Sequence, residues 1–147
     1  LDLQQYINSP SAEVTLQDYQ LYLLRNADNK YRGLGFALAG NFYPDFLLWL
    51  VHNSTGKQYL TLVDPKGIRN MNHDDAKIEF YQEIKSIQAK IQDSSLELNS
   101  FILSITPMKD ILNCQLTQEE LGQKNILFMV ESGHNYLDHM FKKILNT

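Results

Sequence analysis

The chain has 147 residues, of which 44% are hydrophobic and 20% charged, and this composition suits one folded domain spanning residues 1–147. Its formal net charge of −4 argues against a domain that grips nucleic acid mainly through a basic surface. Any contact with DNA must therefore be local or supplied by an attached domain. The single cysteine, Cys114, excludes an intrachain disulfide and a multi-cysteine zinc site.

The sequence carries no segment typical of a membrane protein or a secreted protein. No apolar run approaches the roughly 20 residues that span a bilayer. Residues 1–5 are neither basic nor apolar enough for a signal peptide. We therefore expect a cytoplasmic protein without a membrane partner. Because the sequence starts with Leu1 rather than methionine, we also expect it to be a piece of a longer protein.

The spacing of apolar residues predicts strands interspersed with helices. A short helix is expected at residues 1–7, ended by Asn8-Ser9-Pro10, and longer amphipathic helices are expected at residues 74–91 and 135–145. Strands are expected at residues 20–24, 33–38, 42–51, 59–64, 101–105 and 126–130. Because strands come first and helices pack around them, the predicted fold is α/β with a mixed sheet.

A predicted hairpin brings two carboxylates together. Residues 53–56, with the sequence Asn-Ser-Thr-Gly, are a turn signal between the two most apolar strands. In an antiparallel hairpin closed by this turn, Asp45 and Asp64 lie directly opposite each other, with Cβ atoms roughly 4.5–5.5 Å apart. Because side chains alternate along a strand, Lys66 lies on the same face as Asp64.

Two carboxylates that close predict a divalent cation. Like charges cannot both ionise cheaply in a partly buried site, and one lysine cannot neutralise both. Hard oxygen ligands suit Mg²⁺ or Mn²⁺. Such an ion could polarise a phosphodiester and lower the pKa of a bound water molecule. Lys66 could then orient that water or stabilise charge on the phosphate.

Two structural interpretations compete with this metal site. Asp64-Pro65-Lys66-Gly67 is a good type I turn sequence, in which Asp64 accepts turn hydrogen bonds and Lys66 points to solvent. Asp45, within the most apolar stretch, could instead form a structural salt bridge with Lys66 or Arg25.

The segments around these acids resemble a known nuclease family. Pro44-Asp45 followed by Asp64-Pro65-Lys66 is similar to the signature of PD-(D/E)xK nucleases. Together with the stretches at 23–26, 33–36, 41–49 and 64–67, it resembles the C-terminal endonuclease domain of type III restriction enzymes and related DEAD/DEAH-box helicase–nuclease proteins. The resemblance covers residues 21–91, about half of the chain.

The resemblance implies a restriction-endonuclease-like fold, with a mixed sheet of four or five strands flanked by helices, and Mg²⁺-dependent hydrolysis of DNA. Asp45, Asp64 and Lys66 would then be the catalytic residues. Asp45, Asp64 and the backbone carbonyl of Pro65 would bind the metal. A helicase or ATPase module in the same polypeptide and a methyltransferase subunit are the implied partners. Many members also use an acid on a first helix, for which Asp2 and Glu13 are the early candidates.

Other residues carry weaker indications of function. Lys77, on the predicted helix at 74–91, and Arg25 are candidate phosphate or DNA contacts. For Lys77 a solvated lysine is the favoured interpretation, whereas Arg25 could equally pair with an acid. His73, His134 and His139 are expected in surface roles, and Cys114 is expected to be inert. Two function classes remain: a metal-dependent DNA endonuclease domain, or a non-catalytic domain with the same fold that docks onto DNA or a partner.

Overall fold

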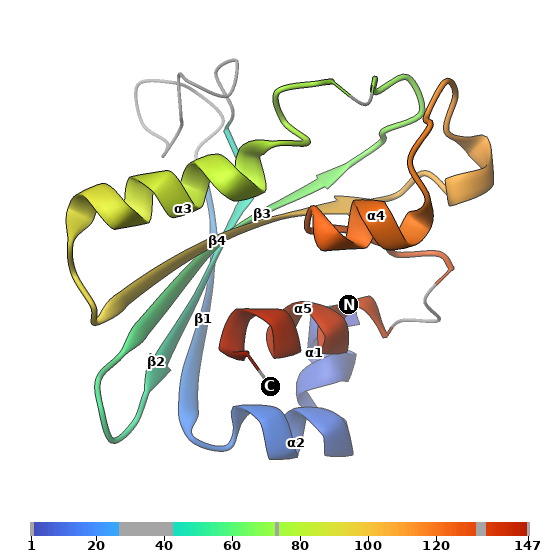
Figure 1. Ribbon diagram of the computed structural model, residues 1–147. Helices are drawn as coiled ribbons and strands as arrows, with labels where there is room; N and C mark the ends of the chain where they lie inside the picture. The colour runs from blue at the N-terminus through green and yellow to red at the C-terminus, as the bar shows by residue number, and fades with distance from the viewer. Residues whose placement is uncertain (1, 27–42, 73, 132–134, 147) are drawn as a thin grey trace.

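The computed structural model describes residues 2–26, 43–72, 74–131 and 135–146. Its centre is a five-stranded sheet in the order β1-β2-β3-β4-β5 (Figure 1). The strands are β1 (Tyr19–Arg25), β2 (Phe46–His52), β3 (Gln58–Lys66), β4 (Leu96–Ser104) and β5 (Ile126–Phe128). The α-helices are α1 (Asp2–Ile7), α2 (Pro10–Leu16), α3 (Phe80–Ile91), α4 (Gln118–Gln123) and α5 (Tyr136–Leu145).

The sheet is mixed, as the sequence predicts. β1, β2 and β3 form an antiparallel meander, whereas β3 pairs with β4 and β4 with β5 in parallel. The parallel step from β3 to β4 is made through α3, because parallel neighbours need a long crossover connection. The coarse prediction of an α/β fold with a mixed sheet is therefore confirmed.

Helices cover both faces of the sheet (Figure 1). On one face α5, with α1 and α2 beside it, packs on a core that includes Leu48, Phe101 and Phe141. On the other face α3 packs on Leu62 and Leu98, and Leu121 of α4 packs on Ile126 of β5. We call these the α5 face and the α3 face. None of the described helices is long and apolar enough to cross a membrane.

The strand positions agree with the prediction better than the strand ends. The strand expected at 20–24 is β1, that at 42–51 overlaps β2, which ends one residue later at His52, and those at 59–64 and 126–130 correspond to β3 and β5. The strand expected at 101–105 is too short, since β4 begins at Leu96. Asn99 and Ser100 interrupt its apolar pattern, although both side chains are buried. The strand expected at 33–38 lies outside the described residues.

The helix ends depend on local capping. The predicted start of the helix at 74–91 is wrong, since α3 begins at Phe80. Residues before it form a turn, in which the Asp75 carboxylate accepts the Lys77 amide hydrogen. The sequence analysis missed α2, which starts where a helix stop was expected because the Ser9 side chain caps the Ala12 amide. It also missed α4, which Thr117 and Glu120 cap reciprocally. The helix expected at 135–145 is confirmed as α5.

Candidate active site on the α3 face

The β2–β3 hairpin has the predicted register. Phe46 pairs with Val63, and the pairing continues down to Val51 with Gln58. The turn closes where the sequence predicts, with the Gly56 amide donating to the His52 carbonyl at 3.0 Å. Gly56 has φ 70°, which explains a glycine at this position. Continued by one residue, the register brings Asp45, exposed directly before β2, opposite Asp64.

Asp64 and Lys66 form a close ion pair on the α3 face. Lys66 Nζ donates to Asp64 Oδ2 at 2.7 Å, and the residue Asp64 is only 3% exposed. β3 runs straight through this segment, with Asp64, Pro65 and Lys66 paired to β4. The interpretation of residues 64–67 as a type I turn is therefore wrong. Alternation along β3 places Asp64 and Lys66 on the side of Leu62, which packs under α3.

Burial dominates the ionisation of Asp64. The loss of hydration raises the pKa of its carboxyl group above the ordinary value of 3.8. The hydrogen bond and charge of Lys66 lower this pKa, but they do not outweigh the burial. The negative charge of Asp45 raises the pKa and the positive charge of Lys77 lowers it. Asp45 and Lys77 are thus both close enough to Asp64 to act on it electrostatically.

The backbone next to Asp64 offers a further oxygen. The Lys66 carbonyl accepts the Ile105 amide hydrogen at 3.1 Å and so points toward β4. Because successive residues of a strand direct their backbone groups to opposite sides, the Pro65 carbonyl points toward β2. The β2–β3 pairs end at Phe46 and Val63, and two residues further along the same register Pro65 would face Pro44, which has no N–H to donate. Among the described residues, the strand ladder therefore offers the Pro65 carbonyl no donor at this end.

Asn26 fixes the backbone that carries Asp45. Its side-chain amide donates to the Pro44 carbonyl at 2.9 Å, and its backbone amide donates to the Asp45 carbonyl at 2.8 Å. Asn26 is buried at the end of β1. Asn26 lies in the 23–26 stretch of the family resemblance, but the sequence gives it no role, because nothing in a local pattern reveals a partner eighteen residues away.

The two basic residues proposed as phosphate contacts lie on different faces. Lys77 precedes α3 rather than lying on it, and its charge acts on Asp64. Arg25 pairs with Phe46, whose side chain packs against the core of the α5 face, so Arg25 points away from Asp64. The alternative in which Arg25 forms a salt bridge with Asp45 on the α3 face is therefore not supported.

The early acids do not complete the site. Asp2 accepts a hydrogen bond from the Tyr136 hydroxyl at 2.8 Å on the α5 face, and Glu13 is exposed on α2 of that face. Within the described parts of the chain, no group of three or more histidine, cysteine, aspartate or glutamate side chains could hold a metal ion. A cation at this site would thus depend on two carboxylates and a backbone carbonyl.

The sequence analysis also missed Glu83 in the first turn of α3. It follows Phe80 by three residues and precedes Ile87 by four, so it lies on the flank of α3 near the sheet. Its Oε2 atom is buried and has no hydrogen-bond partner among the described residues. The α3 face therefore carries a third carboxylate, which no sequence motif indicated.

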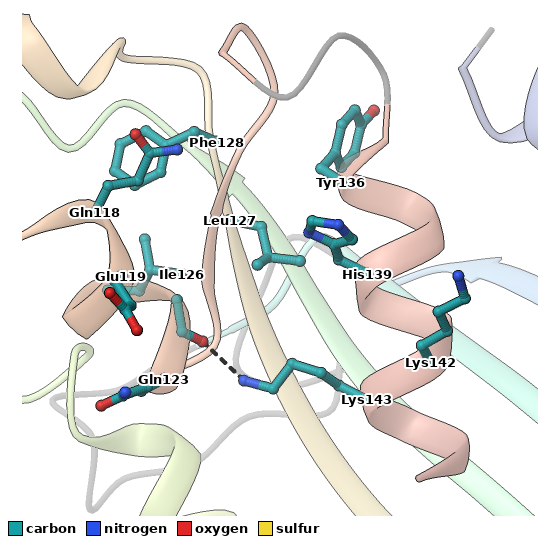
Figure 2. Close-up of a pocket in the computed structure, with 11 residues that line it drawn as sticks. Gln118, Glu119, Gln123, Ile126, Leu127, Phe128, Tyr136, His139, Lys142 and Lys143 are labelled. Carbon is teal, nitrogen blue, oxygen red and sulfur yellow. Dashed lines mark hydrogen bonds between the residues drawn. The ribbon is translucent and has the colours of Figure 1, made fainter. Parts of the chain in front are cut away.

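A larger cleft lies elsewhere, between α4 and α5 (Figure 2). Its volume is about 820 Å³, and β5 forms its apolar floor. Lys143 reaches across from α5 and donates to the Gly122 carbonyl at 2.7 Å. His139 lines this cleft with an exposed side chain, as a surface role requires, whereas His73 and His134 lie outside the described residues. Cys114 is half-buried, with its Sγ atom 3.7 Å from the Leu116 carbonyl oxygen.

Comparisons with protein-family models, with curated proteins and with solved structures found no match for this chain. The assignment of a function therefore depends on the geometry of the α3 face.

Proposed function

We propose that this chain is a Mg²⁺- or Mn²⁺-dependent DNA endonuclease domain with its active site at Asp45, Asp64 and Lys66. The observation that carries the proposal is the buried Asp64–Lys66 pair at 2.7 Å, with Asp45 opposite Asp64 in the hairpin register. DNA as the substrate, the restriction-endonuclease-like fold and an attached helicase module with a methyltransferase partner come from the family resemblance and belong to the same proposal.

The residues present fit a hard divalent cation. Asp45 and Asp64 supply carboxylate oxygens, and the Pro65 carbonyl, which lacks a ladder donor, supplies a neutral oxygen. The raised pKa of Asp64 is the expected state of a buried ligand whose counter-charge is incomplete. When bound, the ion would polarise the scissile phosphate and activate water for attack.

The lysines have distinct roles in this proposal. Lys66 is half-buried beside Asp64, so its ammonium group can hold the attacking water and offset the charge that develops on the phosphate. Lys77 approaches the same carboxylate from the segment before α3 and would contact a flanking phosphate. Asn26 acts through the backbone, because its hydrogen bonds hold the Pro44 and Asp45 carbonyls at the end of β1.

Cleavage of supercoiled plasmid DNA with Mg²⁺ or Mn²⁺ tests this proposal. We expect Asp45→Ala and Lys66→Ala each to reduce the cleavage rate by about 100-fold or more, since each removes a group that acts on the transition state. Glu13→Ala, which removes an exposed acid on the opposite face, is the matched control and should cut at the native rate. Native activity in either active-site variant would reject the assignment.

A non-catalytic domain is the second candidate. The net charge of −4 and the absence of a three-acid cluster among the described residues favour it. In that case the native chain would bind DNA or a partner without cutting at any Mg²⁺ or Mn²⁺ concentration. Metal-dependent cutting that is lost in Asp45→Ala excludes this candidate.

A further inference from the structure

Two aromatic side chains lie next to each other on the α3 face of the sheet. Tyr22 of β1 is the direct cross-strand partner of Trp49 of β2. Trp49 follows Leu47, which packs against the apolar cluster under α3, by two residues, so alternation places both rings on the α3 face. Because α3 packs mainly against β4, Tyr22 remains 50% exposed and Trp49 is half-buried.

Each ring is held along the sheet by a glutamine. The Tyr22 hydroxyl donates to Gln20 Oε1 at 2.8 Å, and Trp49 Nε1 donates to Gln58 Oε1 at 3.1 Å. Gln20 and Gln58 lie on the same face, and the register pairs both of them with Val51, near the β2–β3 turn. The two rings therefore lean in one direction along the strands, each with one side against the sheet and the other toward solvent.

The aromatic pair lies on the same face as the candidate active site. Asp45 precedes Trp49 by four residues, a distance of about 13 Å along an extended strand or about four stacked bases. Leu24 and Leu47, a second cross-strand pair, occupy this face between Trp49 and Asp45. A DNA strand with a phosphate at Asp45 and Asp64 would thus have an apolar surface within a few nucleotides.

The charges of the chain favour DNA bases over phosphates on this surface. None of the side chains of β1 and β2 on the α3 face is charged, and the whole chain has a net charge of −4. An uncharged surface offers no partner to a phosphate group, whereas an aromatic ring stacks on the flat face of any unpaired base. A base inside a duplex exposes only its edges in the grooves, so it cannot stack in this way.

We infer that Tyr22 and Trp49 form a stacking platform for unpaired DNA bases close to the scissile phosphate. The inference rests on the proposed function and specifies its substrate as single-stranded or locally opened DNA. Asp45, Asp64 and Lys66 act on the phosphate, while the platform holds bases of the same strand.

The fluorescence of Trp49 reports on this contact directly, because it is the only tryptophan in the chain. We expect an oligothymidylate of about 12 nucleotides, added in EDTA, to quench this fluorescence, since a strand of that length covers the platform and the candidate site. The same oligonucleotide annealed to its complement should bind at least about tenfold more weakly, because its bases are already stacked and paired. Equal binding of the two forms, or no quenching by the single strand up to about 0.1 mM, would overturn the inference.

Substitutions of Tyr22 test whether the ring itself binds. Tyr22→Ala should weaken binding of the single strand at least about fivefold, whereas Tyr22→Phe keeps the ring and should bind like the native chain. Tyr22→Leu keeps an apolar side chain without a ring, so it should be as weak as Tyr22→Ala and replaces it if circular dichroism shows that the alanine variant is unfolded. Leu23→Ala, at a 47% exposed position on the opposite face of β1, is the matched control with native affinity. Equal affinity of Tyr22→Leu and Tyr22→Phe would contradict stacking.

Failure of the platform can be distinguished from failure of the proposed function. Because EDTA removes divalent ions, the titration does not depend on cleavage. Metal-dependent cutting of plasmid DNA without quenching of Trp49 would reject the platform and keep the endonuclease. Quenching that depends on Tyr22, without cutting at any metal concentration, would support the base-binding surface and reject the endonuclease.

Discussion

At the scale of single residues, Asp64 determines how the proposed site responds to pH. Its carboxyl group is buried beneath the α3 face with Lys66 at 2.7 Å, yet burial still raises its pKa above 3.8. A group whose pKa is raised on folding binds a proton more tightly in the folded state. Its contribution to stability is therefore present at low pH and is lost as the pH rises through the raised pKa.

The variant Asp64→Asn, studied in the absence of metal ions, should reveal how the ionisation of Asp64 makes stability depend on pH. The asparagine has nearly the same shape and no charge at any pH. In EDTA, we expect the two proteins to have similar melting temperatures below pH 3.8, and the native chain to become the less stable one as the pH rises. Thermal unfolding followed by circular dichroism between pH 3 and pH 8 would measure the difference. A native chain that gains stability over the variant as the pH rises would contradict the raised pKa.

At neutral pH, a divalent ion should make the native chain more stable than Asp64→Asn, which is the reverse of the order expected in EDTA. A ligand that binds only the folded state stabilises it by about 2.7 kcal/mol at one hundred times its dissociation constant. For a chain of this size, the corresponding rise in melting temperature is about 5–10 °C. We expect Mg²⁺ or Mn²⁺ to produce this rise in the native chain and not in Asp64→Asn. Glu13→Gln is the control, and its rise should equal the native one.

Strand periodicity in the sequence was enough to predict where three residues of the proposed site lie. Asp45, Asp64 and Lys66 could be placed because a hairpin turn fixes the register and alternation fixes the face. Asn26 and Glu83 could not be placed in this way. Asn26 acts on a carbonyl of another strand, and Glu83 depends on where α3 begins and how it lies over the sheet.

At the scale of elements, the entry of the chain into β2 depends on Asn26. We expect Asn26→Ala to lower the free energy of unfolding by about 1–3 kcal/mol, because the buried side-chain hydrogen bond to Pro44 is lost. It should also reduce the metal-induced rise in melting temperature, since Asp45 is then held less firmly. Urea unfolding measures the free energy of unfolding, and thermal unfolding with and without Mg²⁺ measures the rise in melting temperature.

Asn8→Ala is the matched control for that variant. Asn8 makes the same type of hydrogen bond, to the Gln4 carbonyl at 2.8 Å, but it is exposed. Its replacement should change stability by no more than about 0.5 kcal/mol. If the two variants lost equal stability, the particular role given to Asn26 would be wrong.

Element boundaries show where sequence patterns lose information. The amphipathic helix α5 was predicted almost to the residue, because one strongly apolar face runs along its length. The start of α3 was misplaced, since Asp74 and Asp75 satisfy rules for a helix N-terminus but belong to turns. The missed helices α2 and α4 have 7 and 6 residues, too few for a periodic apolar pattern, and their caps were the available signal.

At the scale of the whole molecule, one sheet separates two apolar layers of different composition. The core of the α5 face contains Tyr6 stacked on Phe141 at 5.1 Å between ring centroids, with Phe141 completely buried. The α3 face instead combines small apolar clusters with the Asp64–Lys66 pair. The largest buried cluster thus lies on the face opposite the proposed active site.

The variant Phe141→Ala tests whether the main core on the α5 face is separate from the proposed active site on the α3 face. We expect it to lower the free energy of unfolding by about 3–5 kcal/mol, because a buried ring leaves a cavity under α5. The rise in melting temperature with Mg²⁺ should persist in the variant wherever it remains folded. Chemical denaturation measures the free energy of unfolding, and calorimetry measures the rise in melting temperature with Mg²⁺. A loss below about 1 kcal/mol would show that the α5 face is not the main core.

The sequence could predict an α/β fold with a mixed sheet but not the neighbours of each strand. Periodicity shows that a strand exists and which of its faces is apolar. It does not show that β1 is an outer strand or that β4 lies between β3 and β5, because those arrangements depend on the crossover through α3 and on packing between distant segments. The hairpin of β2 and β3 was the exception, since its turn is local.

The order of strands in the sheet follows their order along the chain. Local hairpins close in microseconds, before contacts that span long loops can form. Asp45 and Asp64 belong to one such hairpin, so they would meet early during folding, while α3 and β4 are still unstructured. The carboxylates would then repel each other in a nascent hairpin, and divalent ions present during refolding should accelerate its formation.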